Sequence, residues 1–220
     1  MKERERERET IRRKLKTLLK KILPQSFIDL LQQLNLYTFH GLGIGFYREN
    51  PPQFVKEKIF EKYALANSDW VETGTYKGKT THFLSKRFPH VYSIEPDVEL
   101  YKKACYRFKG KNVTLFNDVS ENVLPKLLPK LRGNLNFWLD GHYSGGITFR
   151  GKKDCPIIDE LNAIEINFDN FKKLSIFIDD VRLFLSSTYD YPSIDYLVDW
   201  TRRLDMKWRI VNDIFIIEKK

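Results

Sequence analysis

The chain has 220 residues, of which 42% are apolar and 14% aromatic, and its formal net charge is +9. This composition can bury a sizeable core and excludes a chain that is disordered throughout, and the length fits one domain with a modest extension. Cys105 and Cys155 stand far apart in the sequence. Neither a disulfide framework nor a zinc site is therefore indicated, and a cytoplasmic location is expected.

Much of the positive charge lies near the start of the chain, in residues 11–23. Apolar residues recur there with helical spacing, opposite the basic ones, until Pro24 interrupts: Ile11, Leu15, Leu18, Leu19, Ile22 and Leu23. The pattern predicts an amphipathic helix that packs on the domain or on a partner, or that attaches peripherally to the inner face of an anionic membrane. No RNA- or DNA-binding motif accompanies the charge, so a nucleic-acid partner is not expected.

Other features of the first 50 residues indicate a basic helical extension and linker. A second helix is predicted over residues 27–36. No uninterrupted run of about 18 apolar residues exists, which argues against a conventional transmembrane helix. The opening residues also lack the pattern of a secretory signal. We therefore expect residues 1–50 to precede a catalytic domain at 51–220.

From Pro51 onward, strand and helix patterns alternate. A helix over 54–63 comes first, followed by strands at 70–73, 91–95, 113–117, 135–139 and 174–178 and by helices at 78–87, 98–108, 119–131 and 157–166. Such alternation predicts an α/β fold of the Rossmann-like, doubly wound type, with helices on both faces of a mostly parallel sheet. A helix over 193–204 then precedes strands at 208–211 and 214–218, which predict an antiparallel hairpin.

The loop after the first of these strands carries the first functional signal. Gly74 permits a tight turn and close approach to a ligand, and Gly78 lets the next helix lie close to the strand. A Walker A loop requires four residues between its glycine and its Gly-Lys-Ser/Thr, whereas this loop has three, and Glu72 would repel phosphates. A dehydrogenase fingerprint requires a glycine where Tyr76 stands.

The spacing acid-x-Gly-x-x-x-Gly, from Glu72 to Gly78, resembles motif I of class I S-adenosylmethionine-dependent methyltransferases. Their cofactor carries a cationic sulfonium and an ammonium group and has no phosphate. The resemblance covers roughly residues 69–220 and implies the strand order 3-2-1-4-5-7-6. The cofactor-binding residues that it implies are Glu72, Thr73, Gly74, Thr75, Gly78, Thr80, Glu95, Pro96, Asp118, Val119, Ser120 and Asp140.

Two of these residues have specific roles in the resemblance. Glu95, at the end of the second strand, would accept hydrogen bonds from the hydroxyls of the ribose, a geometry that one carboxylate can satisfy. Asp118, at the end of the third strand, would lie beside the adenine with Val119. The alternatives are that Asp118 caps the following helix and that Glu95 is an ordinary surface acid.

Three further acids follow the fourth and fifth strands: Asp140, Asp179 and Asp180. Neighbouring strand ends would bring them together, which costs free energy unless a cation or protons compensate. The arrangement resembles the macrocin-type and related sugar O-methyltransferases, in which such aspartates hold Mg²⁺. The resemblance implies that these three bind the metal and that Asp140 also serves catalysis. Capping and strand-end hydrogen bonding remain the alternative.

His142 stands where that group often has a second acid, and it is the candidate general base, a substrate contact, a structural histidine or an alternative ligand. The leading hypothesis is methyl transfer from S-adenosylmethionine to a hydroxyl of a small molecule or carbohydrate, with a divalent metal. One alternative is a metal-dependent hydroxylase on the same fold, as in the cephalosporin hydroxylases. Another is a non-catalytic, cofactor-binding protein attached to a membrane through residues 11–23. Homo-oligomerisation is left open.

Overall fold

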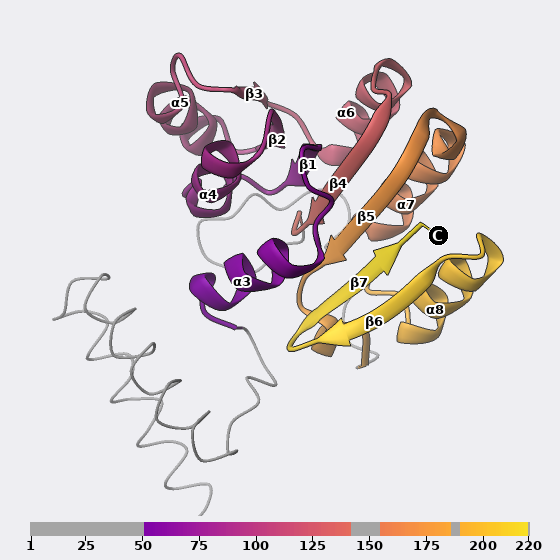
Figure 1. The fold of residues 1–220 in the computed structure, drawn as a ribbon. Coiled ribbons are helices and arrows are strands. Elements are labelled where there is room, and N and C mark those ends of the chain that lie inside the picture. Colours follow the sequence, from indigo (N-terminus) through magenta and orange to yellow (C-terminus); the bar gives the residue numbers. More distant parts are fainter. Residues whose placement is uncertain (1–50, 142–154, 186–189, 220) are drawn as a thin grey trace, which may run out of the picture. The chain divides into compact units, whose positions relative to one another are not determined.

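The computed structural model of the chain describes residues 51–141, 155–185 and 190–219, and these ranges contain a seven-stranded sheet of order β3-β2-β1-β4-β5-β7-β6 (Figure 1). The strands are β1 Asp69–Thr73, β2 Val91–Ile94, β3 Val113–Phe116, β4 Gly133–Leu139, β5 Phe171–Ile178, β6 Lys207–Val211 and β7 Ile214–Glu218. The first five pair in parallel, and β7 runs antiparallel to both β5 and β6. The predicted fold class and strand order are confirmed.

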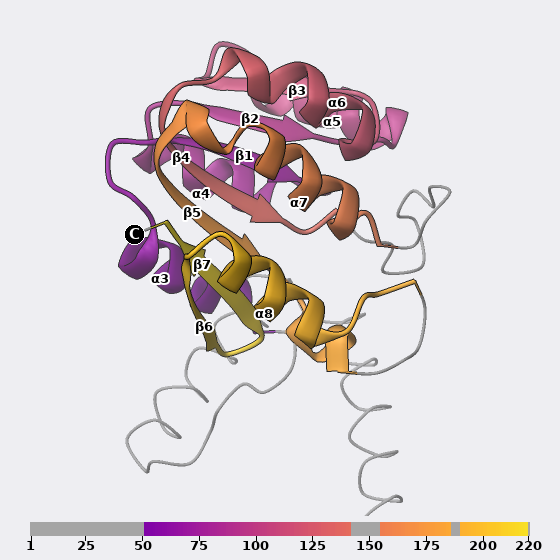
Figure 2. The same ribbon diagram turned by 90° about the vertical axis from the view of Figure 1, so that its right-hand side faces the viewer.

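Within the described ranges, six α-helices cover the two faces of the sheet (Figures 1 and 2). On one face lie α3 Gln53–Tyr63, α4 Lys79–Arg87 and α5 Val98–Arg107, and on the other lie α6 Ser120–Leu127, α7 Ile157–Ile166 and α8 Ile194–Arg203. The helix predicted over 119–131 is shorter than expected. The α-helix ends at Leu127, and a 3₁₀ turn follows over Leu128–Lys130. Pro129 in this turn has no N–H group for an α-helical hydrogen bond.

The start of β5 also differs from the prediction, which placed it at Leu174. The strand begins three residues earlier, at Phe171, which is 1% exposed and pairs with Gly133. The exposed Lys172 and Lys173 interrupt the apolar run in the sequence. A shift in pairing register occurs between Gly133 and Asn134 at the same place, and a bulge of that kind cannot be seen in a hydrophobic pattern.

The two faces of the sheet bury different side chains. Under α3 and α4 lies an aromatic cluster with Phe60 at its centre. The ring centroid of Phe60 lies 5.2 Å from that of Trp70, 4.9 Å from that of Trp138, 5.3 Å from that of Phe177 and 6.3 Å from that of Phe83. The opposite face is mainly aliphatic and packs against α6, α7 and α8. Successive strand residues point to opposite faces, so neighbours such as Phe137 and Trp138 separate into the two layers.

Helix α3 is fixed to the sheet at its carboxyl end by Asn136 of β4. The side chain of Asn136 accepts a hydrogen bond from the backbone N–H of Leu65 at 2.8 Å and donates one to the carbonyl of the same residue at 3.0 Å. Ser175 of β5 also donates to the carbonyl of Tyr63. Together with the burial of Phe60, these contacts hold the helix in one position over β4 and β5.

Some predictions fall outside the described residues. These are the helices predicted over 11–23 and 27–36, and His142. The division between 1–50 and 51–220 stays a prediction. Among the described helices, none combines the length and the apolar composition that crossing a membrane requires.

Candidate functional site

Glu72 is the most deeply buried acid at the carboxyl ends of the strands. It is 0% exposed, and its Oε2 atom accepts hydrogen bonds from the hydroxyls of Thr81 at 2.6 Å and Ser93 at 2.5 Å. Its Oε1 atom is equally buried and has no hydrogen-bond partner among the described residues. Burial raises the pKa of Glu72 to about 7, against the two hydroxyl donors. A cation near Oε1 would restore the ionised form.

The loop that follows Glu72 turns tightly against β4. Gly74 has φ +86°, and a Cβ atom placed on it would lie 2.4 Å from the carbonyl oxygen of Asp140. The N–H of Asp140 in turn donates to the carbonyl of Thr73. Only glycine fits this close approach, which joins the ends of β1 and β4. These two central strands are where the order of the sheet reverses, the usual ligand position in such folds.

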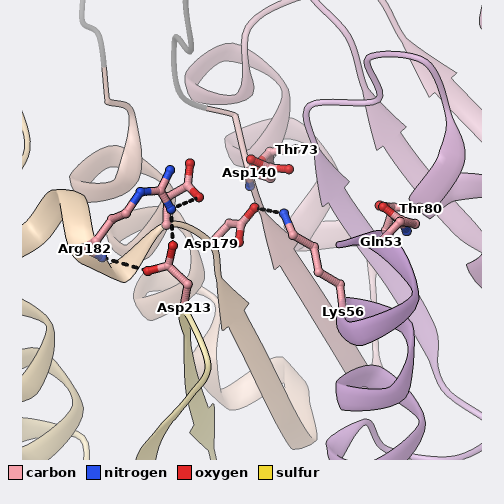
Figure 3. Close-up of polar contacts among 9 residues, drawn as sticks. Gln53, Lys56, Thr73, Thr80, Asp140, Asp179, Arg182 and Asp213 are labelled. Carbon is pink, nitrogen blue, oxygen red and sulfur yellow. Dashed lines mark hydrogen bonds and ion pairs between the residues drawn. The ribbon is translucent and has the colours of Figure 1, made fainter. Parts of the chain in front are cut away.

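Gly78, with φ +65°, caps the start of α4. We expected this glycine to let α4 lie close to β1, but its near neighbour is a different one. A Cβ atom there would lie 2.8 Å from the ring of Phe108, which follows α5, so the glycine admits a neighbouring aromatic ring. The hydroxyl of Thr75 lies 2.6 Å from the oxygen of Ser93 and so extends the hydrogen-bond network of Glu72. The hydroxyl of Thr80 faces α3, where it accepts from Gln53 at 3.2 Å (Figure 3).

Glu95, directly after β2, holds the glycine loop from the other side. Its Oε2 atom accepts from the N–H of Tyr76 at 2.6 Å and its Oε1 atom from the N–H of Asp97 at 3.0 Å. It is 4% exposed, so it is not the surface acid of the alternative reading, and burial raises its pKa despite these two donors. Each carboxylate oxygen can accept more than one hydrogen bond, so the backbone contacts leave capacity for ligand hydroxyls.

Asp118 lies at the end of β3, with its carboxylate turned toward α6. Its Oδ1 atom accepts from the N–H of Val119 at 2.8 Å and from the side chain of Asn122 at 2.9 Å, and these contacts lower its pKa. The helix itself begins at Ser120 without a side-chain cap. Asp118 thus bonds to a side chain of the first turn and does not cap it conventionally.

Asn117 was not predicted from the sequence as a site residue. Its side chain donates to the carbonyls of Glu95 at 2.8 Å and Pro96 at 3.2 Å, and so ties the end of β3 to the end of β2. Asn117 and Asp118 also border an open cavity of about 560 Å³ beside β3 and α6. An asparagine after a strand resembles any turn residue in a sequence, so no local signal could have singled it out.

The ends of β4 and β5 hold their acids differently. Asp179 follows β5, is 3% exposed, and forms an ion pair with Lys56 of α3 through Oδ2 (Figure 3). Its Oδ1 atom is buried without a hydrogen-bond partner among the described residues. Burial and the nearby Asp140 raise the pKa of Asp179 to about 7, against the attraction of Lys56.

Lys56 was not anticipated from the sequence. Its ammonium group lies 5.2 Å from the ring centroid of Trp138, and only 12% of its side chain is exposed. Burial lowers its pKa, but the charges of Asp179 and Asp140 more than offset this, and the pKa is raised overall. Lys56 therefore carries a positive charge at neutral pH.

Asp180 is directed to a different cation. Its Oδ1 atom accepts from the guanidinium of Arg182 at 2.5 Å, and the same guanidinium pairs with Asp213 from the turn between β6 and β7. Asp213 also accepts from the N–H of Arg182 at 2.9 Å. Asp180 has φ +56°, an uncommon backbone conformation that these contacts hold. Figure 3 shows Arg182 and Asp213 on one side of Asp179, and Lys56 on the other.

Two of the three predicted magnesium ligands, Asp179 and Asp180, are paired with different cations. Asp179 pairs with Lys56 and Asp180 with Arg182, whereas a magnesium site needs carboxylate oxygens directed to a common point. Within residues 51–141, 155–185 and 190–219, no group of three potential ligands lies close enough to hold a metal ion. These residues do not fit Mg²⁺ in their observed pairing.

Comparisons with known proteins bear on the fold. Neither a protein-family model nor a curated protein sequence matches the chain. Among solved structures, the 23S rRNA methyltransferase ErmE is similar, with a TM-score of 0.51 and 19% identity over 77% of this chain and 69% of its own. The O-methyltransferase TomG from Streptomyces achromogenes has a TM-score of 0.50 and 13% identity, over 82% of this chain and 84% of its own. The N-methyltransferase NodS from Bradyrhizobium japonicum has a TM-score of 0.50 and 10% identity, over 76% of this chain and 94% of its own.

These structures have different acceptors by their names, and their identity to this chain is low. They show that the described residues adopt a fold that methyltransferases also use.

Proposed function

We propose that the chain is an S-adenosylmethionine-dependent methyltransferase. The observation that carries the proposal is the carboxylate of Glu72, which is fully buried at the switch point of the sheet and lacks a partner for one oxygen. A buried carboxylate is costly unless a donor or a cation meets it. The ammonium group of the cofactor, directly or through a water molecule, supplies that partner.

The surrounding residues fit the rest of the cofactor. Gly74 allows the backbone between β1 and α4 to lie close to a ligand. Glu95 is held by two backbone N–H groups at the position proposed for the ribose hydroxyls, and Asp118 lies at the position proposed for the adenine. Residues at the ends of β1, β2 and β3 would thus hold the nucleoside part of the cofactor.

When bound, S-adenosylmethionine supplies a methyl group on a positively charged sulfur. The bond from an acceptor atom to this carbon forms as the carbon–sulfur bond breaks, and its electron pair stays on sulfur. The residues of this chain orient the acceptor, and orientation of this kind contributes a large share of such rate enhancements. A hydroxyl acceptor also loses a proton, and His142 remains the predicted base for it.

We propose an oxygen of a small molecule or carbohydrate as the acceptor. The ion pairs at the ends of β4 and β5 support this choice, because their ammonium and guanidinium groups donate hydrogen bonds to oxygen atoms. Because ErmE is named as an rRNA methyltransferase, a screen for the acceptor should include RNA.

Calorimetry with S-adenosylhomocysteine, the product form of the cofactor, tests the proposal. We expect saturable binding at one site per chain and a large loss of affinity in Glu72→Ala. The exposed Glu61, which pairs with Arg87 on the surface, provides the control variant Glu61→Ala. Absence of saturable binding, with Glu72→Ala no different from the unmodified protein, would sink the proposal.

The two alternatives predict different results. A hydroxylase on this fold would contain iron after purification, which elemental analysis detects. The contact of residues 11–23 with an anionic membrane remains a proposal. It predicts co-sedimentation with phosphatidylserine vesicles that is lost when Leu15 and Leu18 are both replaced by glutamate, because charged groups oppose burial of the apolar face.

A further inference from the structure

A positively charged side chain of the chain itself, that of Lys56, lies at the ends of β4 and β5. Lys56 reaches there from α3 and pairs with Asp179, a residue 123 positions later in the sequence. A buried ion pair adds little to stability compared with apolar residues of similar size. Stability alone therefore gives a weak reason for a lysine at this place.

Lys56 is also held more firmly than a surface lysine. Asn136 fixes the carboxyl end of α3 to β4, Phe60 packs in the aromatic cluster, and the ammonium group lies over the ring of Trp138. An ammonium has three hydrogen-bond donors. Among the described residues, one hydrogen bond of Lys56 is recorded, to Asp179. Donor capacity is thus left on a positioned cation.

Asp179 supplies an independent indication that a ligand group comes here. Its Oδ2 atom meets Lys56, whereas its Oδ1 atom is buried without a hydrogen-bond partner among the described residues. A buried carboxylate oxygen of this kind can accept a hydrogen bond from the hydroxyl group of a ligand.

Resting on the proposed methyltransferase function, we propose that Lys56 is the built-in cation of the acceptor site. Held by Asp179, its ammonium group binds an oxygen atom of the acceptor in the place that the sequence assigns to Mg²⁺. Asp180 pairs with Arg182, which also pairs with Asp213. The acceptor site takes an oxygen without a divalent metal.

Calorimetric titration of Mg²⁺ into the full-length protein, with S-adenosylhomocysteine present, tests the proposal without an identified acceptor. Lys56→Met removes the charge and keeps the length of the side chain. Lys56→Arg keeps the charge. Lys62→Met, on the exposed side of the same helix, is the matched control.

The unmodified protein, Lys56→Arg and Lys62→Met are expected to show no saturable Mg²⁺ binding below about 1 mM, the weak limit of ordinary protein sites for hard divalent cations. Lys56→Met leaves Asp179 without the ammonium group, so its Mg²⁺ affinity should be at least about tenfold higher, because a buried carboxylate that has lost its cation attracts another. If Lys56→Met fails to fold, as judged by circular dichroism, Lys56→Gln takes its place.

Saturable binding of one Mg²⁺ by the unmodified protein below that concentration overturns the proposal. An unchanged Mg²⁺ affinity in both uncharged variants overturns it as well. Affinity for S-adenosylhomocysteine should stay within about twofold in every variant, because that site lies at the other strand ends. Absence of its binding in all proteins counts against the proposed function, while the Mg²⁺ titration still decides the role of Lys56.

Discussion

The two halves of the sheet edge hold their acids in opposite ways. At the ends of β1, β2 and β3, Glu72, Glu95 and Asp118 accept from hydroxyls, backbone N–H groups and an asparagine, all of which are uncharged. At the ends of β4 and β5, Asp179 and Asp180 each meet a cation of the chain.

This difference indicates which ligand each half is built for. Neutral donors fix the position of a carboxylate but leave its charge to be met by a ligand, whereas a salt bridge satisfies the charge within the protein. The first half therefore suits a cationic ligand, and S-adenosylmethionine carries an ammonium and a sulfonium. The second half presents nitrogen donors and suits an oxygen.

The largest effect is expected at the junction of the two halves. Gly74→Ala forces a methyl group against the carbonyl of Asp140, so affinity for S-adenosylhomocysteine should fall by more than about 100-fold, which corresponds to about 2.7 kcal/mol. Gly110→Ala is the control, because Gly110 also has a positive φ, of +72°, but nothing lies within 4 Å of its Cβ position. Equal losses of affinity in the two variants, measured by calorimetry, would contradict the close approach.

The next effect concerns the charge in the first half. Glu72→Gln keeps the shape of the side chain and removes its charge, so affinity for S-adenosylhomocysteine should fall by between about 10-fold and 100-fold, since hydrogen bonds to charged groups contribute about 1.5–3 kcal/mol. Glu61→Gln should bind like the unmodified protein. Full affinity in Glu72→Gln would show that the charge does not bind the cofactor.

The second half should respond in stability, with cofactor binding preserved. Arg182→Gln leaves Asp180 and Asp213 without their cation, and we expect the free energy of unfolding to fall by about 2 kcal/mol, less than for a fully buried pair because 28% of the arginine side chain is exposed. Urea unfolding measures this change, and calorimetry should find unchanged affinity for S-adenosylhomocysteine. A large loss of affinity would mean that the halves are not independent.

The smallest effect on cofactor affinity is its dependence on pH. Burial raises the pKa of Glu72 to about 7, so binding of a cationic group requires loss of a proton below that pH. Affinity should rise as the pH increases from 6 to 7, by up to about tenfold, and become level near pH 8. Glu72→Gln should show no such rise, and an identical rise in both proteins would assign it to another group.

The same group affects folding stability with the opposite trend. The pKa of Glu72 is higher in the folded state than its ordinary value of 4.5. The folded protein without cofactor therefore has its full stability below pH 4.5 and loses stability as the pH rises toward 7. Relative to Glu72→Gln, the unmodified protein without cofactor should lose on the order of 3 kcal/mol across this range. Paired urea unfolding curves at pH 5 and pH 8 provide the comparison, and a difference that does not change with pH would contradict the burial of this charge.

The sequence predicted the acids of the edge because parallel strands carry their carboxyl ends to the same side of the sheet. It could not predict how each acid is paired. Lys56 lies among other charged residues of a predicted helix, so the sequence indicates an ordinary solvated lysine. Its partner, Asp179, is 123 positions away. Asp213 reads as a hairpin turn residue, yet it pairs with Arg182. Such contacts depend on how helix and hairpin pack on the sheet, which periodicity does not encode.

The most direct test compares S-adenosylhomocysteine with an analogue that lacks its α-amino group, titrated into the unmodified protein and into Glu72→Gln. If Glu72 meets the ammonium group, the unmodified protein should prefer S-adenosylhomocysteine by at least about tenfold, or about 1.4 kcal/mol. Glu72→Gln should then bind both ligands with affinities within about twofold of each other. An equal preference in both proteins would contradict the claim that Glu72 holds a cationic cofactor.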